Sequence, residues 1–230
     1  MRTVKHMEKA FSVLVIGMLI VSLATVAADA RELSAREQMG KAQATLSRYV
    51  TDVLTERNAG RYGFRSLEEA KSARVGEPLP VMLIGLSSLK EYRSDAKVGS
   101  MLIDARTLWF PVLAGGETRT KLEMIIKDGA LVPGEFGGIK SPERISSARK
   151  RLPGLIERGA IPDAKKVTLV RIPALAAEFL YLETGQGDYF LPAMVNPGRF
   201  DLDDGKIYPA ADILSRLRDI AKDIDPKKVR

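Results

Sequence analysis

Three four-residue segments of the chain have the spacing of a Ser–Lys catalytic pair. They run from Ser87 to Lys90, from Ser94 to Lys97 and from Ser147 to Lys150. On a helix this spacing places the amine beside the hydroxyl, where a neutral lysine can activate the serine as a nucleophile. The partner sequences Ser-Asp-Asn and Lys-Thr-Gly, which accompany such pairs in one class of serine hydrolases, do not occur here. We therefore interpret the three matches as chance, and a hydrolase using Ser–Lys or paired carboxylates is the alternative function.

A basic segment between residues 140 and 166 is the feature of the sequence that most directly suggests a function, namely the binding of anions. Its candidate anion-binding residues are Arg144, Arg149, Lys150, Arg151, Arg158, Lys165 and Lys166. Only three acidic residues, Glu143, Glu157 and Asp163, lie in the same stretch. We expect Arg149, Lys150 and Arg151 to share one face with Arg144, which would attract lipid phosphates, anionic glycans or an acidic protein. The competing interpretation is a solvated helix face with no ligand.

The residues that the chain lacks exclude several chemistries. There is no cysteine, and the only histidine is His6. Beyond residue 30 the sequence therefore contains no imidazole and no thiol, which excludes Ser-His-Asp and Cys-His catalysis and zinc, haem or iron–sulfur sites built on those ligands. The acidic run at 201–205 has glycine at its fifth position, whereas a calcium loop needs it at the sixth. We predict no cofactor and no metal, and an enzyme is the less favoured class.

The first thirty residues have the layout of a secretory signal peptide. A basic head of Arg2, Lys5 and Lys9 precedes an apolar run over residues 10–28. Small residues then stand at Ala28 and Ala30, the two positions that a signal peptidase reads. We predict export to the periplasm or beyond, with cleavage after Ala28 or Ala30. A retained membrane anchor is the alternative, since the apolar run is nearly long enough to span a bilayer.

Charge and length limit the rest of the chain. Residues 1–30 hold three basic and two acidic side chains, which leaves residues 31–230 with a net charge of +6. This modest excess suits another envelope protein or an anionic envelope polymer as partner, and we expect no nucleic acid. We predict a single domain over 31–230, with a candidate subdivision at the Gly- and Pro-rich stretch 133–142.

Hydrophobic periodicity and turn signals predict both helices and strands. The expected helices span residues 34–57, 66–73, 141–151 and 209–224, and the expected strands span 80–86, 108–113, 118–126, 167–172, 177–182 and 189–193. The strands come mostly as neighbouring hairpins, with the tight turn at 185–188 joining the last two. This order predicts an α+β fold with antiparallel sheet, a long N-terminal helix, a middle helix and a C-terminal helix.

Two apolar hexamers suggest an internal duplication. Residues 81–86 (VMLIGL) and 167–172 (VTLVRI) are similar, and each is followed by a leucine three residues later. Two copies of one strand–turn–strand unit would explain the likeness, whereas the alternative is that short apolar strands look alike by chance. Together these features favour an exported, non-catalytic envelope protein that acts as a binding or accessory module.

Overall fold

The computed structural model describes residues 33–162, 164–203 and 205–225. The predicted signal peptide lies outside the described residues, so the predicted export stays a prediction. From Ala35 onward the chain packs as one compact unit. No helix in these ranges combines the length and the apolar character that crossing a membrane requires.

Helices and strands are mixed along the chain, which confirms the predicted α+β class. The long helices are α2 (Ala35–Asp52), α5 (Lys140–Glu157) and α7 (Ala210–Lys222), at the expected N-terminal, middle and C-terminal places. The short helical elements are η1 (Ala59–Tyr62), α3 (Leu67–Lys71), α4 (Leu86–Lys90), η2 (Val98–Met101), η3 (Pro173–Leu175) and α6 (Pro197–Phe200). Each long helix buries an apolar stripe, and this burial rather than intrinsic propensity stabilises it.

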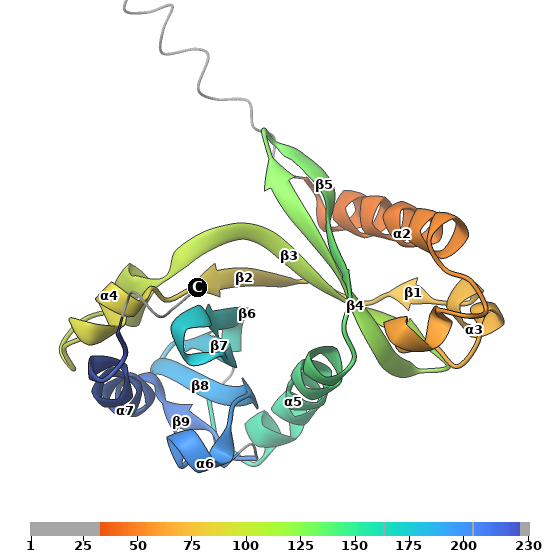
Figure 1. Ribbon diagram of the computed structural model, residues 1–230. Helices are drawn as coiled ribbons and strands as arrows, with labels where there is room; N and C mark the ends of the chain where they lie inside the picture. The colour runs from red at the N-terminus through yellow and green to blue at the C-terminus, as the bar shows by residue number, and fades with distance from the viewer. Residues whose placement is uncertain (1–32, 163, 204, 226–230) are drawn as a thin grey trace, which may run out of the picture. The chain divides into compact units, whose positions relative to one another are not determined.

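Nine strands form one sheet in the described part of the chain (Figure 1). They are β1 (Arg74–Val75), β2 (Leu79–Leu83), β3 (Ile103–Ala114), β4 (Glu117–Lys127), β5 (Ala130–Gly137), β6 (Ala164–Ile172), β7 (Ala177–Thr184), β8 (Gly187–Met194) and β9 (Tyr208–Pro209). Their order is β5-β4-β3-β2-β6-β7-β8-β9, and β1 pairs with β3 beyond the end of β2. All described pairs are antiparallel except β2–β6, which is parallel.

The strand order is symmetric about the β2–β6 pair. On one side lie β3, β4 and β5, and on the other lie β7, β8 and β9. Each half runs through a long helix, a central strand, a short helical turn, a hairpin and a third strand. The two similar apolar hexamers provide β2 and β6, which are neighbours with Val81 opposite Leu169. The topology therefore repeats, while descent of the halves from one duplicated unit stays a prediction.

The second half of the sheet buries both of its faces. Alternate residues of β6, β7 and β8 belong to two separate apolar clusters, as Leu169 and Val170 illustrate. One cluster packs under α4 and α7 with Leu89, Ile213 and Leu217, and the other packs under α5. Because successive side chains of a strand point to opposite faces, both layers follow from continuous apolar runs.

Helix α5 is longer than the sequence predicts. Pro153 and Gly154 were expected to end it near Arg151, yet it continues to Glu157 with Pro153 inside. Proline removes one backbone hydrogen bond and costs about 3 kcal/mol in a helix interior. The buried side chains of Leu152 and Leu155 lie in the last turns and offset this, since each contributes about 1.5–3 kcal/mol on burial.

The stretch 133–142 is not the loop that its glycines and prolines suggest. Its first part belongs to strand β5 and its last part begins α5, so only Gly138 and Ile139 remain between elements. Pro133 is tolerated because β5 is an edge strand of the sheet. Gly134 lies so close to β4 that a Cβ there would meet the backbone oxygen of Glu123 at 2.8 Å.

Aromatic rings attach α2 and η1 to the edge strand β5. The ring of Phe136 stacks between those of Tyr49 and Tyr62, with centroid distances of 4.8 and 5.3 Å. Tyr49 also donates its hydroxyl to the backbone oxygen of Gly134, at 3.2 Å. These contacts fix the turn that follows η1, where Gly63 has a φ of +88°. Gly63 lies against Arg119 of the β3–β4 hairpin, at one end of a groove between this hairpin and α5.

Candidate functional site: a groove between α5 and the β3–β4 hairpin

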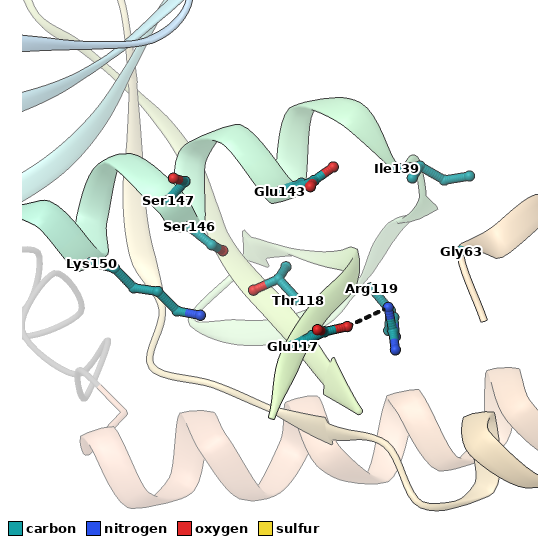
Figure 2. Close-up of a pocket in the computed structure, with 9 residues that line it drawn as sticks. All are labelled: Gly63, Glu117, Thr118, Arg119, Ile139, Glu143, Ser146, Ser147 and Lys150. Carbon is teal, nitrogen blue, oxygen red and sulfur yellow. Dashed lines mark ion pairs between the residues drawn. The ribbon is translucent and has the colours of Figure 1, made fainter. Parts of the chain in front are cut away.

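Two adjoining cavities of about 350 and 250 Å³ form a groove between α5 and the β3–β4 hairpin. The α5 wall of the larger cavity consists of Glu143, Ser146, Ser147 and Lys150. Residues 117–119 form its opposite wall, and Gly63 and Ile139 close one end (Figure 2). The smaller cavity shares Ser146 and Lys150 and ends at Gly76 and Glu77.

Ser146 is the buried polar side chain of this groove. Only 8% of the residue is exposed, and its Oγ has no hydrogen-bond partner in the described part of the protein. A serine inside a helix usually donates to the carbonyl oxygen four residues earlier, so a hydroxyl without a partner is unusual. Figure 2 shows it extending from α5 toward Thr118 on the hairpin. A buried group left unsatisfied costs about 1–3 kcal/mol, which a ligand with a matching polar atom would offset.

Ion pairs hold in place the wall of the groove that residues 117–119 of the hairpin form. Arg119 is largely buried and binds Glu69 of α3 and Glu117 of its own strand, each at 2.8 Å. The backbone N–H of Arg65 and the guanidinium of Arg119 lower the pKa of Glu69 despite the opposing effect of burial. Arg119 is therefore committed to carboxylates of this chain, and it orients the wall rather than offering a free charge.

Two charges in the groove lack an ion pair among the described residues. Arg149 binds Glu77 through Nη2 at 2.6 Å, which links α5 to the segment before β2. Lys150 and Glu143 make no ion pair or side-chain hydrogen bond with another described residue, and both are exposed. They are seven residues apart on α5, which is about 10 Å along the axis and almost the same direction around it. The groove therefore carries an uncompensated cation and an uncompensated anion, with Ser146 between them.

A buried polar network lies beside the first turn of α5. Arg171 of β6 forms a bidentate ion pair with Glu123 of β4 and binds Glu178 of β7 at 2.8 Å. Lys121 also binds Glu123, at 2.7 Å, and Ser141 donates to Glu178 at the same distance. Burial opposes ionisation of Glu123, but hydrogen bonds from Arg171 and Lys121 outweigh it and hold its pKa below the usual value. These side chains fix α5 against both halves of the sheet.

The predicted anion-binding residues do not form one surface. Arg144, Arg149, Lys150, Arg151 and Arg158 lie on or at the end of α5, whereas Lys165 and Lys166 are exposed on β6. Consecutive helical residues are 100° apart, so Arg149 and Arg151 point to different sides of α5, and anion binding by these residues stays a prediction. Arg144, Arg151 and Arg158 instead form one stripe at seven-residue spacing. Of the seven, Arg149 and Lys150 line the groove.

One of the three Ser–Lys pairs also lies in the groove. Ser147 and Lys150 line the same cavity, but neither side chain makes a hydrogen bond to the other or to another described residue. Lysine serves as a base when burial favours its neutral form, and Lys150 is exposed. Lys90, in the first pair, donates instead to the backbone oxygen of Ile224. No cluster of acidic side chains that could hold a metal ion occurs in the described residues.

The sequence alone did not identify Ser146, nor the wall of the groove that residues 117–119 of the hairpin form. Ser146 stands inside an amphipathic helical pattern, where a serine carries no local signal of function. Residues 117–119 looked like the start of an ordinary strand, and Gly63 like part of a loop. The two walls come together only because Gly138 turns the chain from β5 into α5, which packs back on β4. The groove is thus a product of long-range packing.

Comparison of the chain with protein-family models, with curated proteins and with solved structures finds no match.

Proposed function

We propose that this chain is an exported, non-catalytic binding module of the cell envelope, and that the groove between α5 and the β3–β4 hairpin is its ligand site. The observation that carries the proposal is Ser146, which lines the larger cavity and whose buried Oγ has no hydrogen-bond partner among the described residues. A cavity of about 350 Å³ is within the usual range for small-ligand sites. The proposed export rests on the signal-peptide pattern of residues 1–30.

The two walls of the groove are held by ion pairs, and this rigidity supports ligand binding as the role of the groove. Arg119 and Arg149 tie the two walls to α3 and to the segment before β2, and the network at Arg171 fixes α5. A preformed site loses little conformational freedom when a ligand enters. The free energy of binding is therefore not reduced by the cost of ordering the protein.

Site-specific photocrosslinking tests this function. A photoreactive amino acid replaces exposed Ser147 in the full chain, produced in its own host, and the matched control carries it at exposed Lys97 outside the groove. We expect an adduct at position 147 that disappears with an added Ser146→Trp substitution, which fills the cavity. Equal labelling at both positions, or none at 147, would overturn the proposal. Retention of the chain in the cytoplasm, with residues 1–30 intact, would overturn the exported part.

A Ser–Lys hydrolase is the second candidate, because Ser147 and Lys150 share the larger cavity. Its test is treatment of the purified protein with a fluorophosphonate that labels activated serines. Stoichiometric labelling that Ser147→Ala abolishes would favour the hydrolase, and absence of labelling would favour the binding module.

A further inference from the structure

The charged side chains that line the proposed ligand site indicate which class of ligand it binds. This inference rests on the proposed function of the groove as a ligand site. Cations elsewhere in the groove are already neutralised, Arg119 by Glu69 and Glu117 and Arg149 by Glu77. Among the described residues that line the groove, a simple anion would therefore find a single free ammonium group, that of Lys150. An anion site normally gathers several donors or cations, so a small anion is a poor match.

The two uncompensated charges are of opposite sign and are separated along α5. Glu143 and Lys150 lie two helical turns apart, about 10 Å. A molecule that satisfies both must carry a positive group and a negative group, and a separation near this axial rise is within reach of both exposed side chains. Apart from the side chains that are already ion-paired, the described part of the groove carries one positive and one negative charge. This balance favours a zwitterionic ligand over a ligand with charge of one sign.

The hydroxyl of Ser146 lies between these charges and needs a polar partner. An extended peptide rises about 3.3 Å per residue, so three residues span about 10 Å. A tripeptide would thus present its free amine to Glu143, its free carboxylate to Lys150 and a backbone amide to Ser146 Oγ. Thr118, on the opposite wall, supplies a second hydroxyl for the same backbone. We propose that the groove binds short peptides of about three residues through both of their free ends (Figure 2).

Calorimetric titration of the purified protein with defined peptides tests this proposal. The probes are tri-alanine, tri-alanine with an acetylated amine, and tri-alanine with an amidated carboxylate. We expect tri-alanine to bind with a dissociation constant on the order of 0.1 mM, given its few atoms. Each capped peptide should bind about tenfold more weakly, because it loses one charge-assisted hydrogen bond.

Substitutions assign each end of the peptide. Glu143→Gln should weaken tri-alanine about tenfold but leave the acetylated peptide unchanged, and Lys150→Gln should do the same for the amidated peptide. Ser146→Ala should weaken all three peptides about fivefold. Lys166→Gln is the matched control, since it removes the same charge from an exposed site on β6 and should change nothing.

Other outcomes separate this inference from the function on which it rests. If photocrosslinking labels the groove but no peptide binds, or capping has no effect, the peptide assignment is overturned and the ligand site stands. Binding that Lys150→Gln and Lys166→Gln weaken equally would be general surface electrostatics and would overturn the assignment. If dextran sulfate or phosphatidylglycerol vesicles displace tri-alanine from the wild type but Ser146→Ala has no effect, the basic segment is the site and the assignment also fails.

Discussion

Arg171 and Glu123 form a bidentate ion pair although two strands, β2 and β3, separate their strands in the sheet order. In a flat sheet three strand spacings amount to about 14 Å before any offset along the strands. The direct contact combines the length of the two side chains with the curl of the sheet, which the bent course of β3 shows (Figure 1). The curl allows α5 to pack on β4 from one half and on β7 and β8 from the other. The ion pair thus closes the sheet around the helix that carries the groove.

Arg171→Met should destabilise the protein by about 3 kcal/mol, because it leaves Glu123 and Glu178 buried without their shared cation. The measurement is urea unfolding of the purified protein at neutral pH. Arg93→Met is the control, since Arg93 pairs with Asp95 on the surface, where both side chains are more than 70% exposed. That change should stay within about 0.5 kcal/mol. Equal effects of the two substitutions would contradict a buried network that closes the sheet.

The same network makes stability depend on pH. The pKa of Glu123 is below its ordinary value of 4.5 in the folded protein, so its ionised form stabilises the fold above that value. This contribution is fully present at neutral pH and is lost as pH falls through the lowered pKa. The unfolding free energy, measured between pH 7 and pH 2, should therefore decline more steeply for the wild type than for Glu123→Gln. Parallel profiles for the two proteins would show that Glu123 does not contribute.

Gly63→Ala should destabilise the protein by more than 1 kcal/mol and weaken ligand binding in the groove. Gly63 has a φ of +88°, and an added Cβ would lie 2.2 Å from the backbone oxygen of Arg119. Gly40→Ala is the matched control, because Gly40 lies on the exposed side of α2 with nothing within 4 Å of an added Cβ. It should instead stabilise the fold by about 0.5–1 kcal/mol. Thermal unfolding of both variants decides the comparison.

Ser66→Ala should cost about 1 kcal/mol, because it removes the N-cap of α3. The Ser66 hydroxyl accepts the backbone N–H of Glu69 at 3.1 Å. α3 also carries the carboxylate that holds Arg119, so binding in the groove should weaken along with stability. The control is Ser94→Ala, at an exposed serine whose side chain makes no hydrogen bond with another described residue. A loss no greater than that of the control would argue against the cap.

The sequence by itself determined the features that depend on neighbouring residues. The amphipathic patterns of α2, α5 and α7 identify those helices because a buried stripe repeats every three or four residues. The predicted turn at 185–188 is equally local, and it is confirmed. From these elements the α+β class follows, since hairpins in sequence give antiparallel neighbours.

Only the tertiary structure decided how these elements meet. Edge position explains why β5 accepts Pro133, and buried leucines explain why α5 continues past Pro153, but neither fact is visible locally. The parallel pairing of β2 with β6 and the curl of the sheet depend on contacts between residues far apart in the chain. The groove at Ser146 has the same origin, because its two walls come from separate segments that only packing brings together.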